Sequence, residues 1–255
     1  MGPRHGESAE KERLSARRRV MEIGLKEAIV LAGGFGTRLR QVVPDLPKSM
    51  APIGERYFLE ILLTSLATKG FCHVVLSLGY LADRVVNHFG SQFSGMDLSF
   101  EIEHSPLGTG GAVRQAISRC QADHVFVFNG DTYLDLEVDD VESHWQKHRV
   151  PIIVARDVTD TQRYGRLKLR DGCVVEFSGK GIGGPGVINA GCYVLPIDIL
   201  NYFPVGRPFS LETDFFVDAV RTQRIDVFVT HGHFIDIGVP EDYARAQIEL
   251  AGLLH

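Results

Sequence analysis

The stretch Leu31–Lys48, with the sequence LAGGFGTRLRQVVPDLPK, follows an apolar run at Glu27–Leu31 that is typical of a buried strand. Glycine has no Cβ atom, so a glycine-rich turn after a strand lets backbone N–H groups approach an anion closely. Arg38 and Lys48 add two cations to this turn, and Pro47 fixes the backbone just before Lys48. Two cations at one glycine turn predict a site for a polyphosphate.

This turn differs from two other phosphate-binding turns that are rich in glycine. The dinucleotide fingerprint has a third glycine or a small residue where this chain has Leu39. The Walker A loop ends in Gly-Lys followed by Ser or Thr, where this chain has Thr37-Arg38. If only the glycines are considered, a tight turn that binds no ligand remains an alternative. The nearby Lys48 argues against that alternative.

The whole segment resembles the signature of the sugar-nucleotide pyrophosphorylases, the sugar-phosphate nucleotidyltransferases, in which L-A-G-G-x-G-T-R-L is followed by P-K. The resemblance covers nearly all of the chain after Met21. It implies that a sugar 1-phosphate attacks the α-phosphorus of a nucleoside triphosphate and that pyrophosphate leaves. The resemblance assigns nucleotide binding to Leu31, Ala32, Gly33, Gly34, Gly36 and Thr37, and catalysis to Arg38 and Lys48.

The order of expected elements predicts an α/β fold. Strands and helices alternate up to about residue 150, which favours a doubly wound, Rossmann-like, mostly parallel sheet; by resemblance it is of the GT-A-like nucleotidyltransferase type. The expected strands are His73–Leu78, Leu98–Glu103 and Val125–Phe128, and the expected helices are Tyr57–Thr68, Asp83–Phe89 and Ala112–Ser118.

Beyond Pro151 the expected strands are short, with a hairpin turn at Asp171-Gly172, and a helix is expected over Glu241–Leu254. We expect one domain over residues 22–255. Its nucleotide-binding half covers about 22–150 and its smaller, β-rich, sugar-binding half about 151–255. Residues 1–21 are charged and lack apolar periodicity, so we expect a disordered leader there.

Composition narrows the function classes for this chain of 255 residues. The net charge of −5 argues against a nucleic-acid partner, and no apolar run reaches the ~18 residues that would suggest a membrane span. The cysteines form no CxxC pair, so we expect buried small side chains in a reducing, cytoplasmic compartment, without a disulfide framework or zinc site. They are Cys72, Cys120, Cys173 and Cys192. A homodimer is compatible with the sequence.

Two aspartates follow apolar strands and are the expected metal ligands. Asp131 lies in the sequence FNGD and Asp236 in FIDIG. The resemblance implies that they hold Mg²⁺, which prefers oxygen ligands and binds with phosphates, and Asp131 is also expected on the sugar side. The alternative for Asp131 is a capping or turn residue after a strand.

Three further positions match sugar-side segments of the family. Lys180 corresponds to a second catalytic lysine that meets the sugar phosphate, and Gly165 and Asn189 are expected to bind the sugar. The family commonly has Phe-x-Glu-Lys-Pro around this lysine, whereas this chain has Phe177-Ser-Gly-Lys-Gly181. Recognition of the sugar should therefore differ. The alternative for Lys180 is a solvated loop residue.

The segment from Glu103 to Thr109 matches the family's base-reading segment and also contains Gly108. Thymidylyl relatives have glutamine where this chain has Glu103. A carboxylate only accepts hydrogen bonds, so it matches the N1–H and N2–H₂ donors of guanine and favours GTP. The alternative is an exposed charge on an edge strand.

For the sugar, the chain length, the loop at 177–186 and the sequence SLETD at Ser210–Asp214 resemble the branch that acts on manno-configured heptose 1-phosphate. That branch supplies the GDP-sugar for surface polysaccharide. The alternatives are a mannose-1-phosphate guanylyltransferase, a glucose-1-phosphate thymidylyltransferase and a regulatory domain that senses nucleotide sugars without catalysis.

Overall fold

The computed structural model describes residues 25–253 except 35, 37–38, 40–41 and 179–180. Among these residues a ten-stranded sheet runs in the order β10-β11-β13-β9-β12-β7-β1-β4-β6-β5. Its strands are β1 (Glu27–Ala32), β4 (His73–Leu78), β5 (Gln92–Phe93), β6 (Met96–Ile102), β7 (His124–Asn129), β9 (Ile152–Val158), β10 (Arg166–Arg170), β11 (Cys173–Ser178), β12 (Gly186–Pro196) and β13 (Asp226–Val229). Two small ribbons pair β2 (Pro52–Ile53) with β3 (Arg56–Tyr57), and β8 (Thr132–Leu134) with β14 (Phe234–Asp236).

The sheet is mixed, which corrects the expectation of a mostly parallel one. Strands β7, β1, β4 and β6 are parallel neighbours, as the alternation of strands and helices predicts. Strand β12 then enters antiparallel between β7 and β9, and the hairpin β10–β11 adds further antiparallel pairs. The short segments after Pro151 follow one another without long crossover helices, and direct connections of this kind produce antiparallel neighbours.

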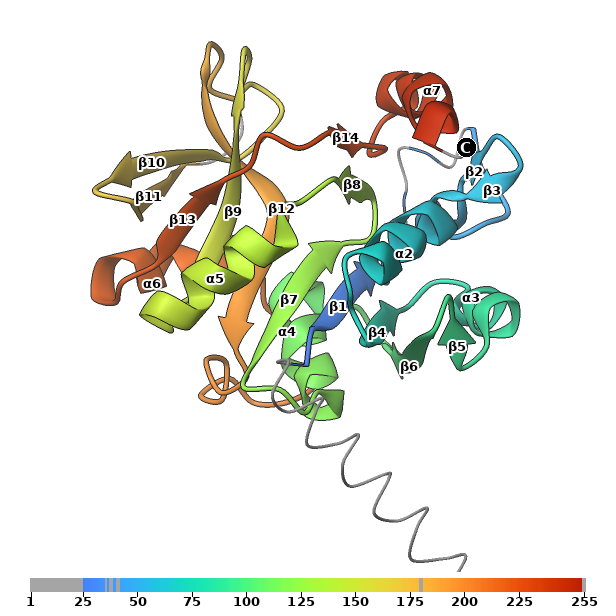
Figure 1. The fold of residues 1–255 in the computed structure, drawn as a ribbon, viewed down its shortest axis with the longest axis horizontal. Coiled ribbons are helices and arrows are strands. Elements are labelled where there is room, and N and C mark those ends of the chain that lie inside the picture. Colours follow the sequence, from blue (N-terminus) through green and yellow to red (C-terminus); the bar gives the residue numbers. More distant parts are fainter. Residues whose placement is uncertain (1–24, 35, 37–38, 40–41, 179–180, 254–255) are drawn as a thin grey trace, which may run out of the picture.

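Helices cover both faces of the sheet, and α2 and α5 lie on the near side in Figure 1. Alternate residues of β1 point to opposite faces: Ala28 and Val30 join one core cluster and Ile29 the other. The helices are α2 (Phe58–Thr68), α3 (Ala82–Phe89), α4 (Gly108–Ala116), α5 (Val138–His148), α6 (Val217–Thr222) and α7 (Pro240–Glu249). Single turns lie at Lys48–Met50, Ile117–Arg119 and Ala251–Leu253, and a π-helical turn, η3, at Leu211–Phe216.

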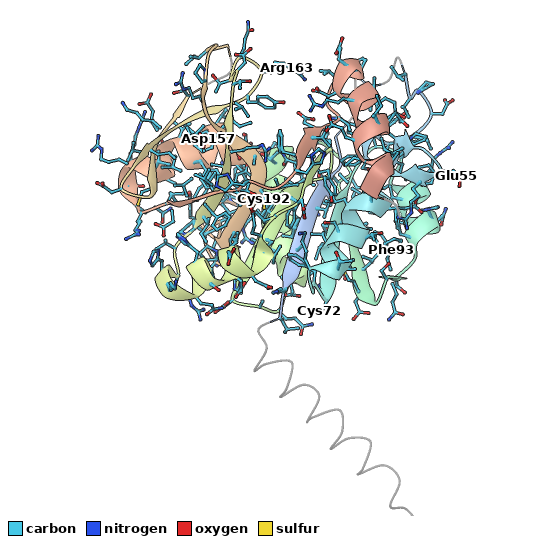
Figure 2. The ribbon with its side chains drawn as sticks, turned by 45° about the horizontal axis from the view of Figure 1, so that its top comes forward. Glu55, Cys72, Phe93, Asp157, Arg163 and Cys192 are labelled. Atoms are coloured by element: carbon cyan, nitrogen blue, oxygen red, sulfur yellow. The ribbon has the colours of Figure 1, made fainter. Side chains whose placement is uncertain are left out.

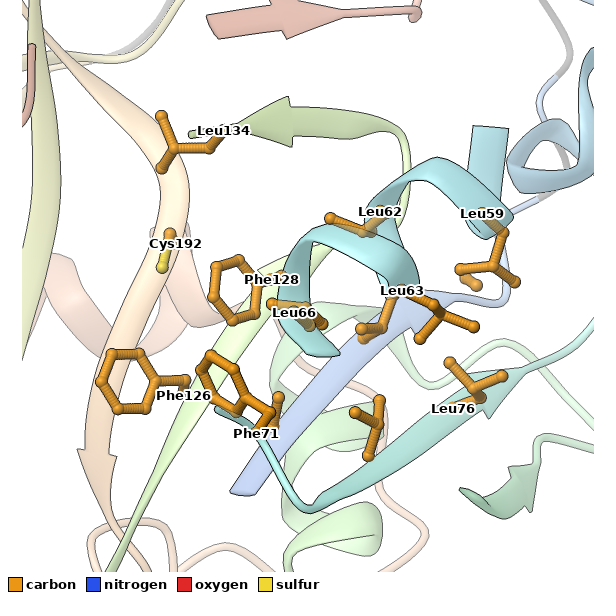
Figure 3. Packing of buried hydrophobic residues seen from close by; sticks show 14 of the residues in the cluster. Leu59, Leu62, Leu63, Leu66, Phe71, Leu76, Phe126, Phe128, Leu134 and Cys192 are labelled. Atoms are coloured by element: carbon orange, nitrogen blue, oxygen red, sulfur yellow. The ribbon is translucent and has the colours of Figure 1, made fainter. Parts of the chain in front are cut away.

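The cluster under α2 shows how apolar spacing fixes this helix on the sheet (Figure 3). Leu59, Leu62, Leu63 and Leu66 recur at helical spacing and are nearly fully buried. They face an aromatic group in which Phe71 meets Phe126 edge-on, with ring centroids 5.2 Å apart. Burial of one such leucine contributes roughly 1.5–3 kcal/mol to folding, so this face sets the position of the strand ends beneath it.

Two predicted helix boundaries are wrong. Helix α4 begins at Gly108, four residues before the expected Ala112, because the carbonyl oxygen of Phe209 accepts from the N–H groups of Gly110 and Gly111 in its first turn. The closing helix α7 ends at Glu249, and a separate single turn follows at Ala251–Leu253.

A third, smaller cluster lies under α7 and joins distant parts of the chain. Leu39 of the glycine-rich segment is almost fully buried there, with Ile235 of β14 and Ala246 of α7. The C-terminal helix therefore packs against the segment that follows the glycine turn. Residues after the ends of β1, β7 and β14 are brought to one edge of the molecule by this packing.

The cysteines are less buried than expected. Cys192 lies in the interior, whereas Cys72 lies near the periphery and, like Cys120 and Cys173, is half-buried (Figure 2). Burial raises the pKa of the Cys120 thiol to about 12. Within the described residues, no helix is long and apolar enough to cross a membrane.

Candidate active site

The glycine turn lies directly against Lys48. Gly36 has a positive φ of 56°, and a Cβ atom added there would come within 2.8 Å of the Lys48 Cβ. Gly33 is equally confined, because an added Cβ would lie 2.8 Å from Oε1 of Glu103. Glycine is therefore needed at position 36 because of Lys48 and at position 33 because of Glu103. The second contact joins the glycine turn to the predicted base-reading segment.

The two predicted metal ligands meet through the ribbon of β8 and β14. Asp131 lies just before β8, and Asp236 is the last residue of β14, which pairs with Thr132. The backbone N–H of Ile237 donates to the carbonyl oxygen of Asp131 at 2.9 Å. This antiparallel ribbon sets the two aspartates side by side although they are far apart in the sequence.

The charges of these aspartates influence each other. The ammonium group of Lys48 forms an ion pair with Oδ2 of Asp131, and only 12% of the Lys48 side chain is exposed. Burial and the negative charge of Asp131 raise the pKa of Asp236, while Lys48 and the N–H of Gly238, which donates at 2.6 Å, act in the opposite direction. Two carboxylates held together in this way form a hard, oxygen-rich donor set that suits a divalent cation.

A pocket of about 310 Å³ lies between the glycine turn and the start of α4. Its lining comprises Leu31, Gly33, Gly34, Glu103, Pro106, Gly108, Thr109, Ala112, Asn129 and Asp131. Five predicted nucleotide-binding residues thus share one pocket: Leu31, Gly33, Gly34, Glu103 and Gly108. Ala32 is buried behind them and Gly36 packs on Lys48, so these two support the turn without lining the pocket.

Glu103 is held at the wall of this pocket. The backbone N–H of Leu107 donates to its Oε2 at 2.9 Å, and the hydroxyl of Ser77 donates to Oε1 at 3.3 Å. Burial raises the pKa of Glu103, and these two hydrogen bonds lower it again in part. Each carboxylate oxygen has two lone pairs, so acceptor capacity remains for a ligand. By contrast, Glu101 is bound by Gln115 and Arg119 outside the pocket.

A second pocket of about 510 Å³ adjoins the first and shares Asn129 with it. Its lining includes Gly165, Asn189 and Asp236, together with Tyr164, Phe177 and Gly191. Asp131, which the sequence also placed on the sugar side, lines the first pocket and not this one. The two aspartates therefore face different pockets across a common boundary.

The second pocket contains a hydrogen-bonded network centred on Glu212 that the sequence analysis did not identify as a site. Its Oε1 accepts from the Tyr193 hydroxyl at 2.9 Å, and its Oε2 accepts from Thr109 at 2.6 Å and Ser210 at 2.8 Å. Asn189 donates to the Tyr193 hydroxyl at 2.7 Å. The sequence SLETD contained the signal for Glu212, but nothing in the sequence showed that η3 faces this pocket. Asn129 was missed in the same way.

Three predicted site residues lie outside the described residues: Thr37, Arg38 and Lys180. Their neighbours are described. Gly36 and Leu39 flank the first two, and Ser178, which precedes the Gly179-Lys180 pair, lines the second pocket.

Residues 27–252 match the family described as Nucleotidyl transferase, so the chain belongs to that family. Over 228 residues it is 36% identical to D-glycero-alpha-D-manno-heptose 1-phosphate guanylyltransferase of Aneurinibacillus thermoaerophilus, covering 88% of this chain and 98% of that protein. The enzyme of the same name from Campylobacter jejuni is 34% identical, with 85% and 96% covered.

The crystal structure of HddC from Yersinia pseudotuberculosis superimposes with a TM-score of 0.80 at 36% identity, covering 89% of this chain and all of the other. HddC has also been solved in complex with GMP-PN, with the same similarity to this chain.

Proposed function

We propose that this enzyme transfers GMP from GTP to D-glycero-alpha-D-manno-heptose 1-phosphate, giving the GDP-heptose and pyrophosphate. The observation that carries the proposal is a pair of adjoining pockets that share Asn129, with Asp131 on one side of the boundary and Asp236 on the other. A triphosphate in the glycine-turn pocket and a sugar phosphate in the larger pocket would meet at this boundary. The two similar heptose enzymes support the choice of substrates.

In this mechanism a phosphate oxygen of the sugar 1-phosphate attacks the α-phosphorus of GTP, and the bond to the β-phosphate oxygen breaks. Two anions must approach each other, and unit charges 4 Å apart repel by ~4 kcal/mol at an effective dielectric of 20. Lys48 would offset this repulsion, and its ion pair with Asp131, which lines the first pocket, supports this role. Arg38 and Lys180 complete the proposed catalytic set, with Arg38 on the departing pyrophosphate and Lys180 on the sugar phosphate.

Asp131 and Asp236 are the residues that would hold Mg²⁺. Their fit rests on the pairing of β8 with β14, which sets the two carboxylates side by side, and on the raised pKa of Asp236, which reflects burial and the negative charge of Asp131. When bound, Mg²⁺ supplies charge neutralisation for the phosphate oxygens. The ion pair with Lys48 orients the carboxylate of Asp131, which lines the first pocket.

Guanine recognition is assigned to Glu103. Its carboxylate is fixed by Leu107 and Ser77 at the wall of the glycine-turn pocket, and it can accept from two neighbouring donors of guanine. Thymine would instead present a carbonyl oxygen to a carboxylate. GTP is therefore the proposed nucleotide.

The same proposal includes the finer architecture and location. Helices on both faces support a doubly wound arrangement, and the two pockets support a nucleotide-binding half at about 22–150 and a sugar-binding half at about 151–255. We place the enzyme in the cytoplasm, where GTP is available. A homodimer, and a product used for capsule, lipopolysaccharide or S-layer glycans, belong to the same proposal.

The test is a pyrophosphate-release assay in which four nucleoside triphosphates are crossed with heptose, mannose and glucose 1-phosphates. We expect GTP with heptose 1-phosphate to give the highest kcat/KM. A preference for mannose 1-phosphate would overturn the sugar assignment alone. A preference for dTTP would overturn the base assignment and leave the family assignment intact.

A substitution tests the role of Glu103 directly. Glu103→Gln should reduce the preference for GTP over dTTP by about 10-fold or more, because loss of a charged hydrogen-bond partner costs ~1–3 kcal/mol. Glu101→Gln is the matched control, since Glu101 lies two residues earlier and is bound by Arg119 outside the pocket. An unchanged preference in Glu103→Gln, or an equal change in the control, would remove Glu103 from base recognition.

A further inference from the structure

A cluster of metal-binding side chains lies away from both pockets, between α5 and β13. His144 and His148 are one helical turn apart on α5, and both meet the same carboxylate oxygen of Asp226, the first residue of β13. The distances to Asp226 Oδ2 are 2.8 Å from His144 Nε2 and 2.5 Å from His148 Nδ1. The three donor atoms all lie within 4.8 Å of one another.

This cluster is separate from the proposed catalytic boundary. The sheet register places Asp226 level with Ile152, Val194 and Phe126 across three strand pairs, and Phe126 lies five residues before Asp131. With about 3.3 Å per residue along a strand and about 4.8 Å between strands, the separation from Asp131 is roughly 20 Å. A ligand at the cluster would not touch the nucleotide or the sugar.

Asp226 is held rigidly and is almost inaccessible, with 1% of its side chain exposed. Its backbone N–H donates to the carbonyl oxygen of Pro151 at 2.8 Å. Both imidazoles retain access to solvent, with 27% and 39% of their side chains exposed. The buried carboxylate thus forms the fixed floor of the cluster, and the two imidazoles form its accessible rim.

A third basic side chain also contacts Asp226. The guanidinium of Arg224 already pairs with Asp226, with Nε 2.6 Å from Oδ1. One carboxylate therefore faces three basic side chains. A neutral imidazole can bind a metal through the nitrogen that now faces Asp226 while its single proton occupies the other ring nitrogen.

We propose that His144, His148 and Asp226 form a binding site for Zn²⁺ or a similar transition-metal ion that ties α5 to β13. Two imidazole nitrogens and one carboxylate oxygen are a donor set typical of Zn²⁺, with bond lengths of about 2.0–2.2 Å. Tetrahedral ligands at such lengths lie about 3.3 Å apart, so small side-chain rotations would close the site.

Arg224 provides an internal check on this assignment. Its side chain is 54% exposed, so the guanidinium can turn into solvent when a cation binds. It competes with the metal for the same carboxylate. Arg224→Ala should therefore bind Zn²⁺ more tightly than the wild type does. If the cluster were only a network of ion pairs, removal of Arg224 would not increase metal affinity.

The experiment uses the full chain without a histidine tag, in excess Mg²⁺ so that the two catalytic aspartates do not bind the probe metal. Zn²⁺ affinity is measured by competition with a chromophoric chelator, and Co²⁺ substitution gives a visible spectrum that reports tetrahedral ligands. We expect one equivalent of metal in the wild type. His144→Ala and His148→Ala should each weaken binding by about 100-fold or more, since even outer-shell partners of a metal contribute ~10–100-fold.

The matched control is His88→Ala, because His88 pairs with a single carboxylate, Glu60, and is similarly exposed. It should bind metal as the wild type does, and melting curves verify that all variants are folded. Absence of binding in the wild type, or equal loss in His88→Ala, would overturn the proposal.

Discussion

Gly36 and Lys48 show how one backbone conformation fixes the position of a proposed catalytic cation. The positive φ of Gly36 and its close approach to Lys48 exclude a Cβ atom at that position. Any other residue would have to push the lysine stem away from Asp131, its ion-pair partner. Glycine is therefore required at position 36 because the Lys48 side chain lies against it, and not only because a phosphate would need close access to the backbone.

The charge of Asp131 leads to a prediction at the residue scale. Asp131→Asn should lower kcat by on the order of 10²-fold or more and raise the Mg²⁺ concentration needed for half-maximal rate, because one of two hard anionic ligands is lost. Steady-state kinetics over a Mg²⁺ titration measure both effects. Asp135→Asn is the control, since Asp135 is exposed and pairs only with Lys69 among the interactions described for its side chain.

Near-normal turnover of Asp131→Asn at ordinary Mg²⁺ would contradict the metal assignment. In that case Asp131 would serve as a turn residue before β8, and its ion pair with Lys48 would be structural.

At the scale of elements, β7 and α5 meet through a buried histidine. His124 is the first residue of β7 and is 4% exposed; its ring stacks on Trp145 of α5 with centroids 4.7 Å apart. Its two nitrogens contact Glu142 at 2.8 Å and Asp123 at 2.6 Å. Burial alone would lower the pKa of His124, but the hydrogen bonds and charges of these carboxylates raise it above 6.5 overall.

This raised pKa predicts a pH dependence of stability. The imidazolium is favoured in the folded state, so its stabilisation is fully present below the unfolded pKa of about 6.5 and is lost as pH rises through the higher folded pKa. The contribution is about 1.4 kcal/mol for each unit by which the two values differ. Urea unfolding at a series of pH values should show a shallower decline above pH 6.5 for His124→Gln than for the wild type.

His88→Gln is the control, because His88 lies at the surface with a single carboxylate partner. An identical pH profile for His124→Gln and the wild type would show that the buried histidine does not titrate in this range.

Most strands and helices of the sheet could be predicted because each contains its own apolar pattern. The sequence predicts strand β4 from its continuous apolar run, which is buried on both faces, and helix α2 to within a residue from apolar residues at a period of 3.6. Helix α5 was missed, because only Val138, Val141 and Trp145 are buried among its charged residues. Without α5, the sequence could not indicate the cluster of His144, His148 and Asp226, because it forms only where α5 packs beside β13.

The sequence predicts which residues belong to the candidate site, but it does not predict how they are arranged in space. The motifs identified Asp131, Asp236 and Lys48, yet only the pairing of β8 with β14 brings the aspartates together. Glu212 could not be assigned from the sequence, because its role depends on hydrogen bonds to Thr109 and Tyr193 from separate elements. Contacts between distant segments are set by packing, which local patterns do not encode.

At the scale of the whole molecule, β12 unites the two proposed halves. It pairs with β7 of the nucleotide half along five residues and with β9 of the sugar half along seven. One continuous sheet therefore underlies both pockets. Relative movement of the halves would have to break these ladders, so substrate binding is expected to rearrange loops around the pockets and to leave the sheet intact.

The charged segment before the first strand gives a prediction at this scale. A chain that begins at Met21 should match the full chain in Tm and in kcat/KM, because residues 1–20 contain little apolar sequence to bury. Thermal unfolding and the pyrophosphate assay on both chains measure this. A clear loss of either would show that the segment docks on the enzyme or at a subunit interface.

The ribbon of β8 and β14 also imposes an order of events during synthesis on the ribosome. Asp131 and the glycine-turn pocket are encoded in the first part of the chain, whereas Asp236 and α7 emerge near its end. A nascent chain that stops before Phe234 therefore has all ten strands of the main sheet but only one of the two carboxylates. If both aspartates hold Mg²⁺ as proposed, such a chain should transfer guanylyl groups far more slowly than the full chain, so the last ligand made on the ribosome sets when activity rises.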